Sequence, residues 1–289
     1  MEYEYLDLLS EVLETGEKKI DRTGVGTLSV FGRTIRHHLS NGFPLITSKK
    51  VAWKPVVGEL LWFIEGGSDE RRLAEITYGT RDPARTTIWT ANANADYWKP
   101  KAQFEGDLGR VYGVQWRHWR KATPDITNVT EIDQLANVVK SLKTNPADRR
   151  MVLTAFNAGE MDQMALPPCH MFAQFHVSQE KKELNCVVYI RSNDLFLGLP
   201  FNMASYALFV HLLAQVTGYN PGELIINIGD AHIYLNHIDQ VKEQLTREPY
   251  PLPTLSLNPD VKDIDGFTMS DIALNGYMSY DSIKAEMAV

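Results

Sequence analysis

The feature that most constrains this chain is an apolar stretch near residue 200. The segment PFNMASYALFVHLLAQVTGY, residues 200–219, has helical spacing and is apolar on nearly every side. A helix that is hydrophobic all round has to be covered on all sides by other elements. The sequence therefore predicts a central helix at 200–219, with the rest of the chain packed around it.

Strand-like runs lie on both sides of this helix. The runs are RRMVLTAFN, HMFAQFHVSQ, ELNCVVYIRSND and, after the helix, ELIINIG. Helical spacing recurs near the N-terminus up to Gly16, in KPVVGELLWFIEG and in EIDQLANVVKSLKTNP. Strands in the middle of the chain with helices around them favour the α+β class, and no linker divides the chain. We expect a single domain over residues 1–289, with the strands in the middle covered by helices.

Charge limits the partners of the chain. The 289 residues carry a net charge of −7, whereas broad nucleic-acid binding calls for a basic surface, so no nucleic acid is expected as a partner. An anionic ligand would have to be met by local arginines. The candidates are Arg22 in DRTGVGT, Arg149 and Arg150 in NPADRRM, and Arg191 in YIRSND, although any one of them taken alone is more often a solvated surface residue.

The sequence also indicates where the protein works. No uninterrupted apolar run approaches the roughly 18 residues of a membrane span, and the first residues, MEYEYLDLLSEVLE, are acidic where a signal peptide is basic. We therefore expect a cytoplasmic protein without a membrane partner. Thiols stay reduced in that compartment, so both cysteines are expected to be free.

The two cysteines have different surroundings. Cys186 shares one face of a predicted strand with three aliphatic residues, which favours an inert core position. Cys169 follows two prolines and precedes His170, so it lies in a stiff loop with a possible proton partner. A nucleophilic cysteine needs its pKa lowered, which nearby arginines can do. The residue pattern alone leaves open whether Cys169 is a nucleophile or packs in the core.

Two further features precede the cysteines. Glu59 lies inside the apolar helical pattern KPVVGELLWFIEG, where a carboxylate is either on the wet side or partly buried. From 66 to 113 the sequence is polar, aromatic and without a clear period, which predicts an irregular segment. Such segments in compact domains are often functional, and Trp89 and Trp98 argue against full disorder here.

Taken together, the motifs resemble one family. The chain is similar to thymidylate synthases along essentially its whole length, in the ordered segments DRTGVGT, GELLWF, VYGVQWR, DRR, LPPCH, QF, RSNDLFLGLPFNMASYAL, GDAHIYLNH and a terminal AV. The resemblance implies a thymidylate synthase-like fold, a single domain with a central, mostly mixed β-sheet covered by helices. It also implies transfer and reduction of a one-carbon unit from 5,10-methylenetetrahydrofolate to carbon 5 of dUMP, which gives dTMP and dihydrofolate without a metal.

Within this resemblance Cys169 is the nucleophile. Adding a thiolate at carbon 6 of uracil turns the ring into an enolate whose carbon 5 can attack a one-carbon electrophile. The other implied catalytic residues act around the base: Glu59 and His170 on the water network at oxygen 4, Asn202 on the pyrimidine edge, Tyr112 in removing the carbon 5 proton, and Arg191 beside them.

The resemblance also implies binding residues for both substrates. Those for the nucleotide are Arg22, Arg191 and Ser192 on the phosphate, Arg149 and Arg150 reaching the same phosphate from a second subunit, and His232 and Tyr234 on the ribose 3′ hydroxyl. A site shared in this way implies a homodimer. Those for the folate are Lys49 on its tail, Trp89 stacking near it, Asp194 on the pterin, and Val289 in a closing C-terminus.

Some positions depart from the family pattern. Asn92 stands where many members have a second tryptophan, Ile190 where glutamine is frequent and Ala173 where an aromatic residue is frequent, and the segment 77–105 is longer than in short members. The nearest alternative is a dUMP hydroxymethylase, which adds water instead of hydride. A catalytically silent homologue with a binding role is a second alternative, against which the retention of Cys169 and Asn202 counts.

Overall fold

The structure is a computed structural model that describes residues 1–20, 24–122 and 129–287. Its α-helices are α1 Glu2–Thr15, α2 Trp53–Glu65, α3 Glu70–Tyr78, α4 Thr90–Ala93, α5 Tyr112–Arg117, α6 Gln134–Thr144, α7 Gly198–Thr217 and α8 Ile238–Leu245. Its strands are β1 Glu17–Lys19, β2 Thr27–His38, β3 Trp119–Ala122, β4 Val129–Ile132, β5 Val152–Thr154, β6 His170–Ser178, β7 Glu183–Asp194, β8 Asn220–Tyr234, β9 Thr254–Leu257 and β10 Ile272–Asn275. Short 3-10 helices, such as η3 Ala158–Gln163 and η5 Ile264–Gly266, connect them.

One mixed sheet organises the molecule. Within the described ranges it has the strand order β1-β2-β8-β7-β6-β5. The neighbours β7 and β8 run parallel, while the other neighbouring pairs run antiparallel. The parallel pair is joined by α7, because parallel strands need a crossover connection. The predicted α+β class with a mixed central sheet covered by helices is thus confirmed.

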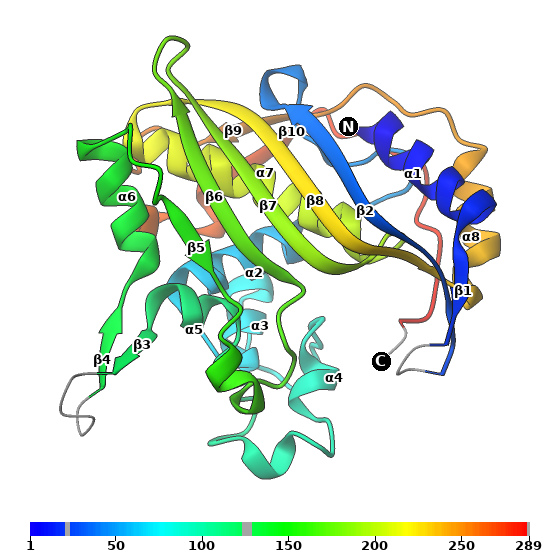
Figure 1. The fold of residues 1–289 in the computed structure, drawn as a ribbon, viewed down its shortest axis with the longest axis horizontal. Helices are drawn as coiled ribbons and strands as arrows, with labels where there is room; N and C mark the ends of the chain where they lie inside the picture. Colours follow the sequence, from blue (N-terminus) through cyan, green and yellow to red (C-terminus); the bar gives the residue numbers. More distant parts are fainter. Residues whose placement is uncertain (21–23, 123–128, 288–289) are drawn as a thin grey trace.

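The two faces of this sheet differ in what covers them. A row of paired residues across five strands, Leu153, Ala173, Val188, Ile226 and Ile35, is at most 3% exposed. Helices α2 and α7 lie on one face of the sheet, behind the strands in Figure 1. The next row, on the opposite face, is Thr154, Phe172, Tyr189, Asn227 and Thr34. None of these five is buried, so this second face has no cover within the described chain.

Helix α7 is the central helix that the sequence predicts at 200–219. It ends at Gly218, which adopts the left-handed conformation with φ 81°. Among the described helices, α7 alone has the length and hydropathy of a membrane span, and 72% of that stretch is buried inside the molecule. Its apolar surface is therefore used as the core against β7, β8 and α2.

The segment 66–113 is more ordered than its sequence pattern predicts. It contains α3, whose first turn is capped by the Asp69 carboxylate accepting from the backbone N–H of Arg71. Gly79 ends the helix in the left-handed conformation, and Leu73 and Ala74 are buried. Helix α3 packs on α2, so tertiary contacts and two caps stabilise a helix that has few apolar residues.

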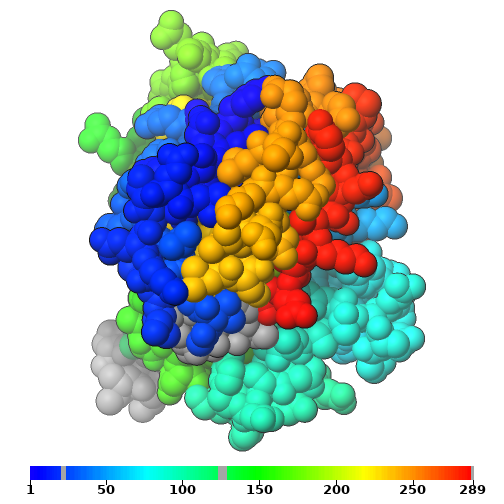
Figure 2. Space-filling model, turned by 90° about the vertical axis from the view of Figure 1, so that its right-hand side faces the viewer, coloured from blue at the N-terminus to red at the C-terminus, as the bar shows by residue number. Residues whose placement is uncertain are grey.

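The C-terminal segment runs along one side of the molecule. Figure 2 shows it beside α8 and reaching towards the segment 78–105. Its hydrogen bonds to the body of the protein include Tyr277 Oη to the carbonyl of Ile46, the Tyr280 N–H to the carbonyl of Thr47, and His237 Nε2 with the carbonyl of Glu286 at 2.6 Å. The last described residues, up to 287, are thereby directed towards the lower end of the sheet in Figure 1.

Candidate active site

Several strand ends meet at one edge of the sheet. Strands β7 and β8 are parallel, so their carboxyl ends, at Asp194 and Tyr234, lie at the same edge. Strand β6 runs antiparallel to β7 and begins there with His170. Strand β2 runs antiparallel to β8 and begins there with Thr27. The sheet topology therefore gathers the motifs LPPCH, RSND and DAHIY, which lie far apart in the sequence.

Cys169 is held in place by its neighbours at this edge. Its backbone N–H donates to the Tyr112 hydroxyl at 2.8 Å, and its carbonyl accepts from the Arg191 N–H at 2.9 Å. The Arg191 guanidinium donates to the carbonyls of Pro167 and Pro168. These bonds aim Arg191 Nη2 at Cys169 Sγ, 3.8 Å away. The two prolines that stiffen the loop thus also orient the arginine.

The two thiols are free and differ in accessibility. Burial raises the pKa of Cys169, and the positive charge of Arg191 opposes this only in part. The pKa of this thiol is therefore not lowered overall, contrary to what a simple arginine effect predicts. Cys186 is 1% exposed, and burial raises its pKa strongly with no opposing charge. The predicted core position of Cys186 is confirmed.

Glu59 and Trp89 form a pair beside Tyr112, whose hydroxyl accepts from the backbone of Cys169. Trp89 is 6% exposed, and its indole Nε1–H donates to Glu59 Oε1 at 2.7 Å. Burial raises the pKa of the Glu59 carboxyl to about 7, against the lowering effect of the indole hydrogen bond. Trp89 also packs edge-on against Tyr112, with ring centroids 5.8 Å apart. Glu59 can therefore take up or release a proton near neutral pH.

Tyr112 and His170 stack on each other, with ring centroids 4.1 Å apart. Burial lowers the pKa of His170 to about 3, so its imidazole is neutral at pH 7. Its Nδ1 is 2.9 Å from the hydroxyl of Tyr206 in α7. Burial raises the pKa of Tyr112 well above its usual range, so Tyr112 keeps its proton. Cys169, Tyr112, His170, Glu59 and Trp89 thus form one contiguous cluster.

Polar side chains at the ends of β7 and β8 extend the cluster. Asn202 lies in the second turn of α7, and its Oδ1 accepts from Nδ2 of the buried Asn193 at 3.3 Å. Asp194 pairs in register with His232, and Ser192 pairs with Asp230. The Asp230 pKa falls to about 2, mainly through its bond with His232 and with help from Ser29.

The remaining predicted residues at this edge are Tyr234 and Lys49. Tyr234 packs edge-on against His232, with ring centroids 5.2 Å apart. Lys49 is buried, and its ammonium donates to the carbonyl of Phe196 and lies 3.4 Å from the centre of the Phe196 ring. Burial lowers the Lys49 pKa to about 7, against the effect of the Asp194 charge. Asp194 itself accepts from the N–H groups of Phe196 and Leu197.

Arg149 and Arg150 lie away from this cluster. The carbonyl of Arg149 accepts from Gln174, and the adjacent Met151 carbonyl accepts from the Phe175 N–H, so this segment lies beside the middle of β6. Five to six residues of extended chain separate this level from Cys169, which corresponds to about 20 Å. The side chain of Arg150 is 87% exposed. The predicted residues Arg22 and Val289 lie outside the described residues.

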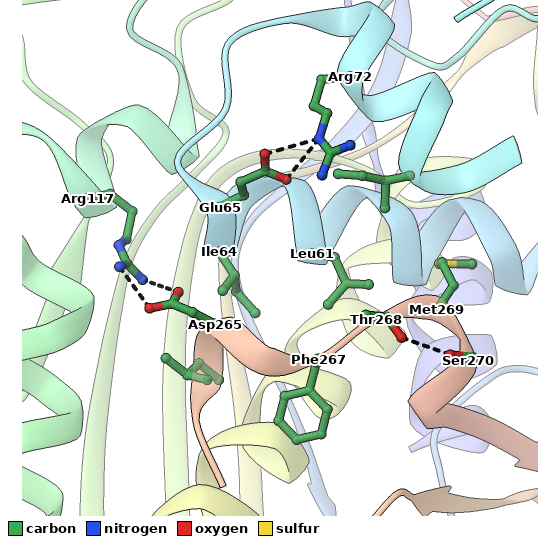
Figure 3. A pocket seen from close by; sticks show the side chains of 12 residues that line it. Leu61, Ile64, Glu65, Arg72, Arg117, Asp265, Phe267, Thr268, Met269 and Ser270 are labelled. Carbon is green, nitrogen blue, oxygen red and sulfur yellow. Dashed lines mark hydrogen bonds and ion pairs between the residues drawn. The ribbon is translucent and has the colours of Figure 1, made fainter. Parts of the chain in front are cut away.

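A cavity elsewhere in the molecule contains none of the predicted site residues. It has a volume of about 710 Å³ and lies between α2, α3 and residues 264–270 (Figure 3). Its charged groups are already paired: Glu65 with Arg72 at 3.0 Å and Arg117 with Asp265 at 2.7 Å. It therefore offers no unpaired charge to an anionic substrate. In the described part of the chain, no three His, Cys, Asp or Glu side chains are arranged to hold a metal ion.

Two residues of the cluster were missed by the sequence reasoning. Tyr206 has a hydroxyl on the buried side of a largely apolar helix, and Asn193 interrupts the polar and apolar alternation of β7 by being buried. A polar group at a core position was the available signal, because such groups need a partner when buried.

Comparison with known proteins agrees with this arrangement. The family model for thymidylate synthase matches residues 3–289. The chain therefore belongs to the thymidylate synthase family. Membership supports a one-carbon transferase that acts on carbon 5 of dUMP with methylenetetrahydrofolate as co-substrate, and it covers both methyl and hydroxymethyl products.

Proposed function

Starting from membership of this family, we propose that the protein is a thymidylate synthase, which converts dUMP and 5,10-methylenetetrahydrofolate into dTMP and dihydrofolate. The observation that carries the proposal is the Cys169 thiol, fixed beside Arg191 and Tyr112 at the edge where the strands end. A silent homologue would have no need for a thiol held in this way.

In the proposed reaction Cys169 attacks first. Its sulfur forms a bond to carbon 6 of the uracil ring, and the displaced electron pair moves to oxygen 4 as an enolate. Burial keeps the thiol protonated in the free protein at neutral pH, so the thiolate has to form once the nucleotide is bound. Arg191 supports that step because its guanidinium is the charge nearest to the sulfur.

The enolate oxygen requires hydrogen-bond donors as charge develops on it. Glu59 suits this role because its pKa of about 7 allows it to donate a proton near neutral pH. His170 is neutral and fixed by Tyr206, so it can order water without adding a charge. Asn193 donates to the Asn202 oxygen, which fixes the amide that we assign to the pyrimidine edge.

Carbon 5 then attacks the one-carbon unit and loses its proton. We assign Tyr112 as the helper in that proton transfer, because its hydroxyl lies against the backbone of Cys169. Its strongly raised pKa keeps it protonated, so it acts through hydrogen bonding and not as a phenolate base. Loss of that proton expels the tetrahydrofolate nitrogen from the one-carbon unit and leaves an exocyclic methylene on carbon 5, with sulfur still on carbon 6. Hydride from the tetrahydrofolate then adds to the methylene to give a methyl group and dihydrofolate, the double bond between carbons 5 and 6 forms again, and the Cys169 thiolate leaves carbon 6.

For the phosphate we propose Arg22, Arg191 and Ser192 from one subunit, together with Arg149 and Arg150 of the partner subunit. Two observations support the shared site. Within one chain these two arginines lie beside the middle of β6, about 20 Å from Cys169. The uncovered face of the sheet, which includes the 38% exposed Tyr189, supplies a surface on which a second copy can pack.

For the folate we propose Trp89, Asp194, Lys49 and Val289. Trp89 offers an indole wall next to Tyr112, and the Asp194 carboxylate lies at the strand edge beside His232. These residues fit an aromatic, hydrogen-bonding pterin. The Lys49 ammonium is directed to Phe196 in this structure, so it has to turn outwards to meet a carboxylate of the tail.

The choice between hydride and water depends on how dry the folate side is. Trp89 is buried between Trp62 and Tyr112 and favours exclusion of water, which supports the methyl product. Asn92 is only half-buried and is the feature that favours the hydroxymethylase.

The chemical identity of the product distinguishes the thymidylate synthase from the hydroxymethylase. The purified protein, given dUMP and methylenetetrahydrofolate, is expected to release dihydrofolate and dTMP in equal amounts. Dihydrofolate is followed by absorbance, and product mass separates methyl from hydroxymethyl. A hydroxymethyl product with unoxidised tetrahydrofolate would replace the proposal by the hydroxymethylase. With fluorodeoxyuridylate and methylenetetrahydrofolate, absence of a stable covalent mass shift would favour the silent homologue.

A further inference from the structure

Glu70 is a buried carboxylate without a role in the proposed reaction. It is the first residue of α3 and is 2% exposed. Its two oxygens accept from Arg71 Nε at 2.6 Å and Arg71 Nη2 at 2.5 Å. The hydroxyls of Thr87 and Thr90 donate to Glu70 Oε1, each at 2.6 Å. We refer to Glu70, Arg71, Thr87 and Thr90 as the Glu70 network.

The network holds the turn that carries Trp89. The Trp89 N–H donates to the Thr87 hydroxyl at 3.2 Å, and the Thr87 N–H donates to the Thr90 hydroxyl at 2.8 Å. Arg71 also donates to the carbonyls of Asp82 and Arg85, so the ion pair of Glu70 and Arg71 also holds the segment that precedes the turn. Burial on its own raises the pKa of Glu70, but the bonds from Arg71 and the two hydroxyls outweigh it and keep the group ionised.

We propose that Glu70 is a positioning residue: through Thr87 and Thr90 it fixes the turn at 87–90 and thereby holds the indole Nε1–H of Trp89 on the carboxylate of Glu59. Glu70 lies on α3 and Glu59 on α2, and the turn connects the two carboxylates through hydrogen bonds and covalent chain. The proposal deepens the proposed function, on which the catalytic meaning of Glu59 rests.

The consequence for Glu59 has a definite sign. The indole hydrogen bond stabilises the ionised form of Glu59 and lowers its pKa from the value that burial alone would impose. Loosening the turn weakens that bond, so the Glu59 pKa has to rise. A hydrogen bond to a charged group corresponds to roughly one to two pH units, and partial loss of it to about one.

Other titratable groups face Glu59 and have to be separated from this effect. They are Tyr112 of α5 and, behind it, His170 at the start of β6 and Cys169 just before that strand. At neutral pH these three are uncharged in the free protein, since burial raises the pKa of Tyr112 and of the thiol and lowers that of His170. A change at Glu70 alters the Glu59 pKa through the hydrogen bond from Trp89, whereas a change in these three groups would alter it through Tyr112.

The test measures the Glu59 carboxyl directly in the full-length protein without substrate. The infrared band of the protonated carboxyl is followed against pH and assigned by its absence in Glu59→Gln. In Glu70→Ala we expect its midpoint to rise by about one pH unit. The double variant Thr87→Val with Thr90→Val is isosteric, keeps the Glu70–Arg71 pair and should give the same direction of shift, which covers failure of Glu70→Ala to fold.

The matched control is Glu75→Gln, on the same helix, with a side chain that is 41% exposed and paired with Arg72 and Arg81. It should leave the midpoint unchanged. Trp89→Phe removes the indole donor and should raise the midpoint, and adding Glu70→Ala to it should raise it no further. An unshifted midpoint in folded Glu70→Ala would overturn the proposal. The proposal would also fail if Glu70→Ala raised the midpoint as much in the Trp89→Phe background as it does in the wild-type protein.

The same variants separate this inference from the proposed function. If Glu59 acts in turnover, the pH profile of kcat/KM should shift in Glu70→Ala in parallel with the infrared midpoint. A shifted infrared midpoint with an unshifted kinetic profile supports the positioning role of Glu70 and counts against the role of Glu59 in the reaction. A merely structural role of Glu70 would lower the amount of folded protein without moving either midpoint.

Discussion

Cys169 and Cys186 are the same side chain in two environments. Cys186 points into the core from the middle of β7, where burial leaves its thiol inert. Cys169 lies one residue before β6, half-buried, with the guanidinium of Arg191 3.8 Å from its sulfur. The difference between packing and candidate chemistry is therefore made by position in the sheet: one cysteine lies within a strand and the other at a strand end.

The residue-scale prediction is that Cys169→Ala abolishes turnover while nucleotide binding stays measurable. Attack at carbon 6 has no substitute nucleophile, whereas the arginines still meet the phosphate. Turnover is followed by dihydrofolate absorbance and binding by calorimetry with dUMP. Cys186→Ala is the matched control and should keep turnover near the wild-type rate. An exchange of the two phenotypes would show that the nucleophile is assigned to the wrong residue.

At the scale of elements, α2 has to lie very close to α3. Gly58, immediately before Glu59, faces Thr77 of α3, and a Cβ added at Gly58 would lie 2.1 Å from Thr77 Oγ1 and 3.0 Å from Thr77 Cβ. The absence of a side chain at Gly58 therefore sets the distance between the helices. That distance places Glu59 on α2 relative to the turn that follows α3.

We predict that Gly58→Ala destabilises the fold despite the better helix propensity of alanine. Overpacking at so short a distance costs about 3 kcal/mol, and the propensity gain returns about 1, so the free energy of unfolding should fall by about 2 kcal/mol. Chemical denaturation measures it. The same substitution in a Thr77→Ala background should cost clearly less, because the clashing hydroxyl and methyl groups are gone. An equal cost in both backgrounds would mean that the contact does not limit the packing.

At the scale of the whole molecule, one face of the central sheet is covered by helices and the other is not. The row from Thr154 through Tyr189 to Thr34 crosses five strands without cover in the described chain. Arg149 and Arg150 come just before β5, the outermost strand of this sheet, and are exposed. A homodimer formed through this face would cover it and bring the partner's arginines towards the Cys169 cluster.

The prediction at this scale is complementation between two inactive chains. Mixing Cys169→Ala with Arg150→Ala should restore about a quarter of the wild-type activity, since half of the dimers are mixed and each has one intact site. Subunit exchange is confirmed by native mass spectrometry. Mixing Cys169→Ala with Arg191→Ala is the control and should restore nothing, because Arg191 belongs to the same chain as the thiol it faces. Equal outcomes in the two mixtures would argue against the crossed arginines.

Local pattern was sufficient for the helices and strands whose apolar period is strong. The central helix was predicted at 200–219 and observed at Gly198–Thr217, and the N-terminal helix ends at Gly16 as expected. The short alternating runs in GTLSVFGRTIRHHLSNGFPLIT, residues 26–47, predict strands and a turn, yet Thr27–His38 is one continuous strand. Pairing with β8 along the length of β2 stabilises that strand across Gly32, and long-range pairing leaves no mark in a short sequence window.

By itself the sequence determined the α+β class and the buried central helix, because these follow from apolar periodicity. Motif order determined the family, and the family implies the mixed sheet. Only the tertiary structure decided that α3 forms, that Glu59 is paired with Trp89, and that burial outweighs Arg191 at the Cys169 thiol. The physical reason is that pKa values and hydrogen-bond partners depend on distances between residues remote in the chain. Those distances are set by packing and not by spacing along the sequence.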